Sequence, residues 1–522
     1  MNLAIIHYHL NRSGVTQVIE NHLRAWDAVA GGGQRRSAAV LFGGRRQGWH
    51  EQLADELSAV RLRLCQVPLL EYDIRRRHAP ADPGQLAREI RRALDQLGFA
   101  PEQTVLHIHN HALGKNVALP GAVGRLAEQG YALVLEPHDF PEDYRPANFQ
   151  AFASLYGHSA PDSWHGWLYP QAPHIHYAVL NGRDAAALRR AGVDPDRLHL
   201  LPNPVLDVGT LPPKDEARRR LEQRFGVGRD QRFLLYPVRC IRRKNVGEAV
   251  LYGAVAPPET VVGMTLPAVN PAEAPIYERW KAFAAEHALP CRFELGAAGG
   301  LRFPENLAAA DLALTTSVAE GFGMAFLESW LAGLALVGRD LPEITADFTC
   351  AGLRLDYLRP KLLVPLEWVG RDAFGHALLA AYHRTLASYG RSDHVSLEGV
   401  LQVKGTDGLV DFADLGEAQQ ERVIQRVVRS QADRRELLAL NPWLLQQPAE
   451  EDGSQALIDH NQEVIGAHYA LIPSGRRLAA LYRQALDSPR HLPPRPLAQA
   501  ARILDAFLDL NRFRLIRSTH SA

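Results

Sequence analysis

Short apolar runs alternate with stretches of helical periodicity along most of the chain. The first run, LAIIHYHL at residues 3–10, predicts a buried strand, and the next segment places Val15, Leu23 and Trp26 on one helical face. Strands that alternate with helices in this way are typical of a parallel sheet covered by helices on both faces. Further strands of this first series are expected at 38–42, 104–109, 132–137, 176–181 and 198–203.

A second alternating series follows a break in the pattern. Residues 204–231 combine prolines, glycines and dense charge, which predicts a domain junction containing a short charged helix. We therefore expect an α/β fold with two doubly wound, Rossmann-like domains facing a central crevice, where ligands meet the carboxyl ends of the strands. The strands of the second series are expected at 233–238, 260–266, 291–295, 311–317 and 334–338.

These patterns suggest boundaries at 1–205 for an N-terminal, acceptor-side domain and 206–358 for a C-terminal donor domain. Residues 359–522 are expected to be a mainly helical extension that completes the C-terminal domain, because 417–443 and 455–515 repeat Leu and Ala at helical spacing.

Composition excludes several classes of protein. Lys+Arg and Asp+Glu are both 58, so no overall field attracts nucleic acid or an anionic membrane, and a phosphate-bearing partner needs a local cluster. The four cysteines include no C-x-x-C pair, which argues against a disulfide scaffold and a zinc–thiolate site. With no basic leader region and no run of 18 apolar residues, we expect a cytoplasmic protein.

The stretch TTSVAEGFGMAFLESWLAG, residues 315–333, places Glu320 on a glycine-broken turn and Glu328 in the helix that follows. Gly321 and Gly323 let the backbone turn sharply, and the first amides of the helix favour an anion such as a diphosphate. Ionised carboxylates on either side of it suit sugar hydroxyls. The structural alternative is a loop-capping glutamate and a solvated helix glutamate.

A second stretch, YPVRCIRRKN at 236–245, ends a strand at Arg239 and places Lys244 at the start of a helix. Two cations at the carboxyl end of a strand can neutralise a leaving diphosphate without a metal. The alternative is a solvated basic turn, because Arg242 and Arg243 lie beside them and the four side chains cannot all point inward.

Together the two stretches resemble retaining glycosyltransferases of family 4, which have the GT-B fold. That family has the pattern E-G-F-G-x4-E after one strand of its C-terminal domain and an R-x4-K pair after an earlier strand. The resemblance extends to PENLAAADLALTTS and LLPNPV and covers roughly residues 1–345. It implies that Glu320 binds the donor sugar, Glu328 the ribose, and Arg239 with Lys244 the diphosphate. The implied donor site also includes the turn residues Gly321, Phe322, Gly323 and Met324.

The resemblance also assigns roles in the N-terminal domain. Gly14 lies in the loop after the first strand, where a family glycine lets the backbone approach the donor, although this chain has Ser13-Gly14 where the family often has two glycines. His138 follows a strand at the position of a family histidine beside the donor sugar, so it joins Arg239, Lys244 and Glu320 as a catalytic candidate. Its neighbour Asp139 is an acceptor-side candidate.

The stretch HIHNH places His107, His109 and His111 on one face of a predicted strand. Imidazoles at this spacing can converge on zinc, but no carboxylate or thiolate completes the set nearby in the sequence. We therefore predict no metal site, and we expect His109 and His111 to be acceptor-side contacts at a polar strand end.

The predicted function is retaining transfer of a hexose from a nucleoside-diphosphate sugar to an unidentified acceptor, with no cofactor required. The alternatives are a nucleotide-sugar 2-epimerase of the same fold and a non-catalytic sugar-nucleotide-binding protein; a glycan phosphorylase would need a pyridoxal-phosphate lysine, for which no motif is evident. We expect no nucleic-acid partner. Acidic residues interrupt the basic segment 72–94, which favours a solvated surface helix over membrane contact. The sequence does not indicate an oligomeric state.

Overall fold

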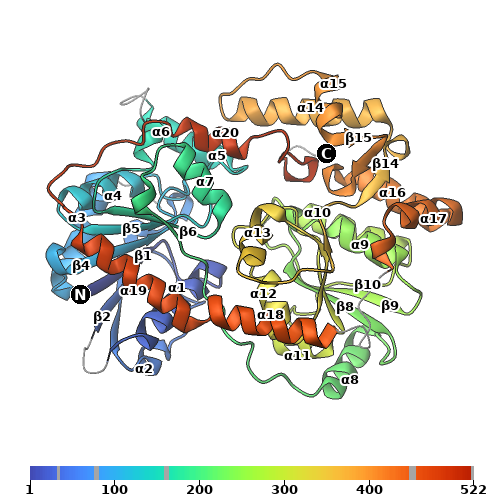
Figure 1. Ribbon diagram of the computed structural model, residues 1–522, viewed down its shortest axis with the longest axis horizontal. Helices are drawn as coiled ribbons and strands as arrows, with labels where there is room; N and C mark the ends of the chain where they lie inside the picture. The colour runs from blue at the N-terminus through green and yellow to red at the C-terminus, as the bar shows by residue number, and fades with distance from the viewer. Residues whose placement is uncertain (32–35, 76–81, 158–163, 446–453, 519–522) are drawn as a thin grey trace. The chain divides into compact units, whose positions relative to one another are not determined.

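The computed structural model of the 522-residue chain forms two compact units, each built from two separate stretches of sequence (Figure 1). Unit 1 comprises Met1–Leu206 and Ala467–Leu508, and unit 2 comprises Asp207–Gly466 and Asp509–Ala522. The structure describes residues 1–31, 36–75, 82–157, 164–445 and 454–518.

Unit 1 contains a parallel sheet with the strand order β3-β2-β1-β4-β5-β6-β7. This order is that of a Rossmann fold, and it confirms the doubly wound arrangement predicted from the sequence. The strand β3 was not predicted; its alternating sequence VRLRLCQ carries two arginines. The bounds are β1 Asn2–His7, β2 Arg36–Phe42, β3 Val60–Gln66, β4 Thr104–His109, β5 Ala132–Glu136, β6 Ile175–Val179 and β7 Leu198–Leu200.

Helices bury both faces of this sheet. Successive residues of β1 alternate between two cores: Leu3 and Ile5 pack with α1 and α19, whereas Ala4 and Ile6 pack with α3 and α4. Burial on both faces explains why the strands are apolar runs rather than alternating ones. The helices of unit 1 are α1 Gly14–Ala28, α2 Leu53–Glu56, α3 Pro83–Leu97, α4 Leu119–Glu128, α5 Pro146–Tyr156, α6 Trp164–Trp167, α7 Gly182–Arg190, α19 Leu471–Asp487 and α20 Ala501–Phe507.

The helix α19 comes late in the sequence but belongs to unit 1. It lies along α1 (Figure 1), and a Cβ on Gly475 would stand 2.0 Å from the carbonyl oxygen of Ala25. Glycine therefore permits the close approach of these two helices. The sequence interpretation assigned all of 359–522 to the second domain, whereas 467–508 cluster with the first unit.

Unit 2 repeats the same topology with the order β10-β9-β8-β11-β12-β13, again with parallel neighbours. A small antiparallel sheet, ordered β14-β16-β15, follows it in the chain. The bounds are β8 Arg232–Arg239, β9 Thr260–Leu266, β10 Cys291–Arg292, β11 Leu312–Thr315, β12 Leu336–Arg339, β13 Leu358–Arg359, β14 Leu363–Pro365, β15 Gly405–Thr406 and β16 Leu409–Asp411.

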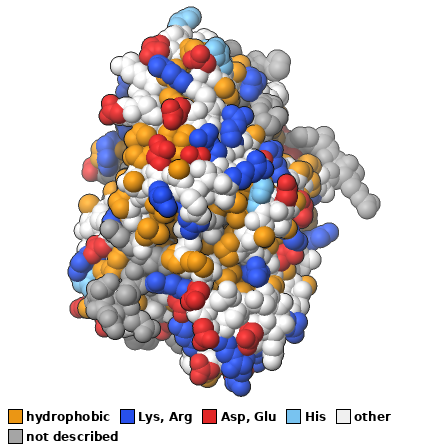
Figure 2. Space-filling model, turned by 90° about the vertical axis from the view of Figure 1, so that its right-hand side faces the viewer, with side chains coloured by type: hydrophobic (Ala, Val, Ile, Leu, Met, Phe, Trp, Pro, Cys, Tyr) orange, Lys and Arg blue, Asp and Glu red, His pale blue; other side chains and the backbone are white. Residues whose placement is uncertain are grey.

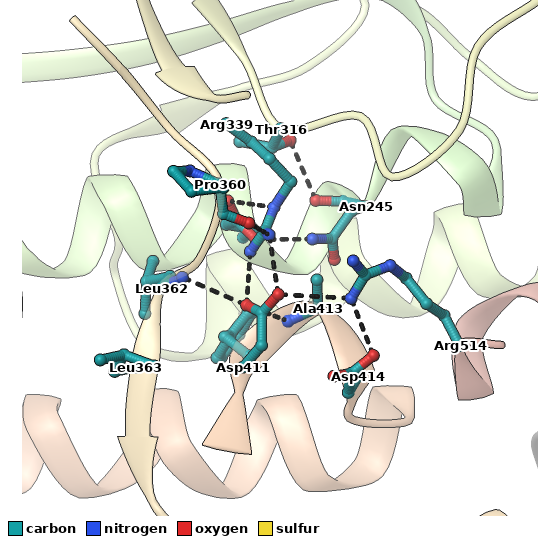
Figure 3. Close-up of polar contacts among 12 residues, drawn as sticks. Asn245, Thr316, Arg339, Pro360, Leu362, Leu363, Asp411, Ala413, Asp414 and Arg514 are labelled. Atoms are coloured by element: carbon teal, nitrogen blue, oxygen red, sulfur yellow. Dashed lines mark hydrogen bonds and ion pairs between the residues drawn. The ribbon is translucent and has the colours of Figure 1, made fainter. Parts of the chain in front are cut away.

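A buried ion network ties the small sheet to the large sheet of unit 2 (Figure 3). Arg339, at the end of β12, donates to Glu248 at 2.6 Å and to Asp411 at 2.8 Å. Arg514 donates to Asp414 at 2.8 Å and to Asp411 at 3.3 Å, which anchors the C-terminal segment.

The helices of unit 2 are α8 Lys214–Phe225, α9 Val246–Val255, α10 Ala274–Glu286, α11 Phe303–Ala309, α12 Ala325–Leu331, α13 Pro342–Cys350, α14 Arg371–Ser388, α15 Leu397–Lys404, α16 Glu417–Arg429, α17 Gln431–Leu440 and α18 Ser454–His468.

The distribution of surface charge and the hydropathy of the helices are both relevant to membrane contact. Figure 2 shows acidic and basic side chains interspersed over one face, in keeping with their equal totals. Across the described ranges, no helix has both the length and the apolar character that crossing a bilayer requires. Residues 76–81 of the basic segment 72–94 lie outside the described residues, and the rest of it includes most of α3.

Candidate functional site

Two loops at the carboxyl edge of the unit 2 sheet are joined by hydrogen bonds. They follow the adjacent parallel strands β8 and β11. The carbonyl oxygen of Lys244 accepts from the Tyr236 hydroxyl at 2.8 Å and from the Thr316 hydroxyl at 2.9 Å. The amide of Val318 donates to the carbonyl oxygen of Arg243 at 2.8 Å. These bonds fix the basic loop after β8 against the loop that carries Glu320.

The carboxylate of Glu320 lies between two cations. Lys244 Nζ donates to Glu320 Oε1, and Arg243 Nη1 donates to Glu320 Oε2 at 2.7 Å. The Glu320 side chain is only 9% exposed. Burial by itself would raise the pKa of this carboxyl group, but the charges of Lys244 and Arg243 outweigh burial and lower its pKa to about 2. Glu320 is therefore ionised at neutral pH and offers acceptor oxygens.

The three consecutive basic residues of the 3-10 helix η5, Arg242–Lys244, do not all have the same partner. Arg243 and Lys244 face Glu320, whereas Arg242 donates to the carbonyl oxygen of Ser518 at 2.9 Å. The sequence interpretation had left Arg243 among the flanking arginines, so its contact with Glu320 is a site feature that it missed. Arg239 ends β8 and is exposed.

The glycine-rich turn before α12 is tightly packed. Gly323 has φ 89°, and a Cβ there would stand 2.7 Å from the ring of Phe326, so glycine is required. Phe322 is buried, and its ring lies edge-on to Phe348 with the centroids 5.4 Å apart. Glu328 is half-buried in α12, and burial raises its pKa. The turn thus separates an ion-paired glutamate from one whose charge is poorly compensated.

In unit 1, His138 follows β5 at the carboxyl edge of the sheet, as predicted. The amides of His138 and Asp139 donate to Asn110 Oδ1 at 2.8 and 2.9 Å, which fixes this turn. His138 Nε2 lies 2.8 Å from His109 Nδ1, and burial lowers the pKa of His138. Asp139 accepts from the guanidinium of Arg145 at 2.5 Å.

The expectation that three histidines share one strand face is wrong. Strand β4 ends at His109, and Asn110 adopts a left-handed φ of 58°, which redirects the chain. His111 Nε2 lies 3.0 Å from the carbonyl oxygen of Leu168, away from His107 and His109. Neither His109 nor His111 is exposed, so this conformation offers neither of them a surface for acceptor contact.

No carboxylate lies near His107 and His109 in the sequence, but the fold brings one to them. Glu136 in β5 is in register with His109 in the neighbouring strand β4, and Glu136 Oε2 lies 2.6 Å from His107 Nε2. His22, in α1, lies 3.7 Å from the same oxygen. Burial lowers the pKa of both His22 and His107 to about 3. Reading the ends of neighbouring parallel strands together could have found Glu136.

Gly14 begins α1 after the Ser13 N-cap, whose hydroxyl accepts from the Thr16 amide at 3.3 Å. A Cβ on Gly14 would meet no atom within 4 Å. The fold itself therefore does not require glycine at this position.

No known protein-family profile matches the chain. Among curated proteins, the mannosylglucosyl-3-phosphoglycerate synthase of Petrotoga mobilis is 29% identical over 336 residues, which is 63% of this chain and 63% of that relative. The match therefore spans less than two thirds of the relative's length.

Solved structures share the fold. Sucrose-phosphate synthase from Thermosynechococcus elongatus aligns with a TM-score of 0.52 and 13% identity, over 93% of this chain and 98% of that one. Anabaena HepE, in complex with UDP and glucose, aligns with a TM-score of 0.50 and 12% identity, over 92% and 98%. At such identities the likeness establishes the fold alone, and it confirms the predicted GT-B class with its two Rossmann-like sheets.

Proposed function

We propose that this chain is a retaining glycosyltransferase that moves a hexose from a nucleoside-diphosphate sugar to an unidentified acceptor. The observation that carries the proposal is the ionised Glu320 held by Lys244 and Arg243 where two adjacent strands end. Carboxylates and cations at the carboxyl edge of a doubly wound sheet suit a ligand that contains both sugar hydroxyls and phosphates.

In this proposal the donor is held from both ends of its diphosphate. Glu320 accepts hydrogen bonds from the sugar hydroxyls, and Glu328 accepts them from the ribose. Arg239 and Lys244 neutralise the diphosphate, for which the exposed guanidinium of Arg239 is accessible. Gly321, Phe322, Gly323 and Met324 form the turn beside it, and Gly14 of unit 1 lets the backbone approach the donor.

The reaction breaks the bond between the sugar C1 and the diphosphate oxygen and forms a bond from C1 to the acceptor oxygen on the same face. Arg239 and Lys244 stabilise the negative charge that grows on the leaving group, while the sugar becomes oxocarbenium-like. The departing phosphate oxygen takes the proton of the acceptor hydroxyl. His138 is neutral at pH 7 because burial lowers its pKa, so it contacts the donor sugar as a hydrogen-bonding imidazole.

The curated relative suggests the first substrates to test. Its name describes synthesis of a mannosylglucosyl-3-phosphoglycerate, so a nucleoside-diphosphate mannose and glucosyl-3-phosphoglycerate are the first donor and acceptor. A synthase as relative favours group transfer over the two alternatives, 2-epimerisation and non-catalytic binding.

A two-stage experiment tests the proposal. Thermal shift against a panel of nucleotide sugars identifies the donor, because a ligand that binds the native state raises the melting temperature. Release of nucleoside diphosphate is then measured with and without acceptor. Transfer predicts release that depends on the acceptor; acceptor-independent conversion of the donor would indicate an epimerase, and a thermal shift without turnover would indicate a binding protein. The same assay is applied to Arg239→Ala, which removes a proposed ligand of the diphosphate. Arg229→Ala, which removes an exposed ion pair, is its matched control.

A further inference from the structure

Four side chains converge in the interior of unit 1: His22 from α1, His107 and His109 from β4, and Glu136 from β5. All four are fully buried, and each offers one ligand atom within 4.8 Å of the others. Glu136 Oε2 lies 2.6 Å from His107 Nε2, 3.5 Å from His109 Nδ1 and 3.7 Å from His22 Nδ1. We call these residues the His3Glu cluster.

Most polar side-chain atoms of the cluster lack a hydrogen-bond partner among the described residues. Within the described ranges no hydrogen bond reaches either oxygen of Glu136, either nitrogen of His22, or the Nε2 atoms of His107 and His109. Burying such groups unpaired is unfavourable, and native proteins seldom do so. The contact between His107 and Glu136 is short yet lacks hydrogen-bond alignment, as expected of two atoms directed at a shared ion.

The spacing suits a small metal ion. Ligand atoms at 2.0–2.1 Å from a tetrahedral zinc stand about 3.3 Å apart. The contacts of Glu136 Oε2 with His107 Nε2 at 2.6 Å and with His22 Nδ1 at 3.7 Å lie on either side of that separation. The rings are already grouped, since His107 stacks on His109 with the centroids 4.5 Å apart and on His22 at 5.5 Å.

The surroundings resemble the outer shell of a metal site. His107 Nδ1 lies 2.8 Å from the Tyr482 hydroxyl, and His109 Nδ1 lies 2.8 Å from His138 Nε2. Metal-bound imidazoles commonly use their second nitrogen in this way, which fixes the ring orientation. Among described residues the ion-pair partners of Glu136 are all histidines, so no lysine or arginine compensates its charge.

We propose that His22, His107, His109 and Glu136 bind one divalent transition-metal ion, zinc in the first place, in a closed four-ligand site. Imidazole nitrogens with one carboxylate oxygen are ligands that zinc accepts, and neutral imidazole is the binding form of histidine. Four protein ligands leave no open coordination position, so the ion is structural. It would link α1 to β4 and β5, and its ligand His109 contacts His138. This inference goes beyond glycosyl transfer and does not depend on it.

The first test measures metal in the purified protein. The full chain is produced without a histidine tag in zinc-supplemented medium, passed through chelator-treated buffer, and assayed by plasma mass spectrometry. We expect about one zinc per chain in the wild type and at least a fivefold lower content in His22→Gln. His176→Gln is the matched control, because His176 is also buried but pairs with His199 at 2.8 Å, outside the cluster, and it should keep its zinc.

A second measurement decides the matter even where His22→Gln does not fold. Wild-type protein from cobalt-supplemented minimal medium should contain about one cobalt per chain and show visible ligand-field bands, without the thiolate charge-transfer band of cysteine ligation. Wild-type protein with less than about a fifth of an equivalent of metal from both media would overturn the proposal. So would folded His22→Gln with wild-type metal content, or loss of metal from His176→Gln alone.

Discussion

Replacing Glu320 by glutamine removes one negative charge from between Lys244 and Arg243 while keeping the size of the side chain. Glu320 is 9% exposed, and both cations donate to it. The variant leaves the Lys244 ammonium and the Arg243 guanidinium, both partly buried, facing each other across a neutral amide, whose single oxygen can accept well from only one of them. The structure therefore predicts a loss of stability.

The pKa of Glu320 gives the size of that loss. Its value falls from 4.5 to about 2 in the folded chain, and each pKa unit corresponds to about 1.4 kcal/mol. The charged form thus contributes about 3 kcal/mol to folding at pH 7. Because the folded pKa is depressed, this contribution is fully present above pH 4.5 and is lost as the pH falls toward 2. We expect Glu320→Gln to be about 2–3 kcal/mol less stable at pH 7, and the difference to shrink in acid.

The matched variant is Glu328→Gln. Burial raises the pKa of Glu328, so its charge disfavours the folded state at neutral pH, and the neutral amide should be neutral or stabilising. Function should show the opposite order. Glu328→Gln should weaken binding of free nucleoside diphosphate, which carries the ribose, whereas Glu320→Gln should leave that affinity nearly intact and lower turnover.

The assays are urea unfolding, followed by tryptophan fluorescence and circular dichroism, and titration calorimetry with the nucleoside diphosphate. Equal unfolding free energies for wild type and Glu320→Gln at pH 7, or a difference that grows in acid, would refute the electrostatic reasoning. Equal effects of the two variants on nucleoside diphosphate affinity would refute the assignment of sugar and ribose.

Arg239→Ala should lower turnover about a hundredfold but change the unfolding free energy by less than about 0.5 kcal/mol, because this side chain is exposed; unchanged kcat would contradict the diphosphate role. Gly14→Ala and Gly124→Ala both place a Cβ where no atom lies within 4 Å, so both should fold normally, and calorimetry should find weaker donor binding only in the first. Brief EDTA treatment should leave turnover intact, since side-chain cations neutralise the diphosphate; loss of turnover that added magnesium restores would count against this. Arg339→Met should cost about 3–5 kcal/mol in urea unfolding, because it leaves Asp411 with a buried charge and one cation fewer; a loss below 1 kcal/mol would show the network to be dispensable.

Strong periodicity explains why the fold could be predicted. Strands such as β1 and β5 contribute apolar residues to both cores, and a helical pattern follows each, so the sequence carries the signal of a covered parallel sheet. The strand β3 was not predicted because its residues after Val60 are mostly half-buried and include arginines, which interrupt the apolar run. The place of α19 could not be predicted, because the packing of distant segments has no local signature.

The sequence likewise predicts some residues of the candidate site and misses others. Glu320, Glu328, Arg239 and Lys244 stand at fixed spacings along the chain, so a motif can reveal them. Arg243 could not be assigned, since the direction of each side chain in η5 depends on the short 3-10 turn that ends at Asn245, where φ is 48°. Glu136 joins His107 through the register of two neighbouring strands, and His22 joins it through helix packing, so neither stands at a motif spacing along the chain.

The return of residues 467–508 to unit 1 has a consequence for synthesis on the ribosome. Leu478, Leu481 and Tyr482 of α19 complete one core of unit 1, yet about 260 residues separate the two stretches of that unit. At roughly 5–20 residues per second, the nascent sheet waits about 10–50 s with that face incomplete. Unit 2 also includes Asp509–Ala522, so neither unit has all of its residues until that stretch is synthesised. Until Ala467–Ala522 is synthesised, both units expose incomplete cores to association with other chains, and this stretch supplies the last elements of each.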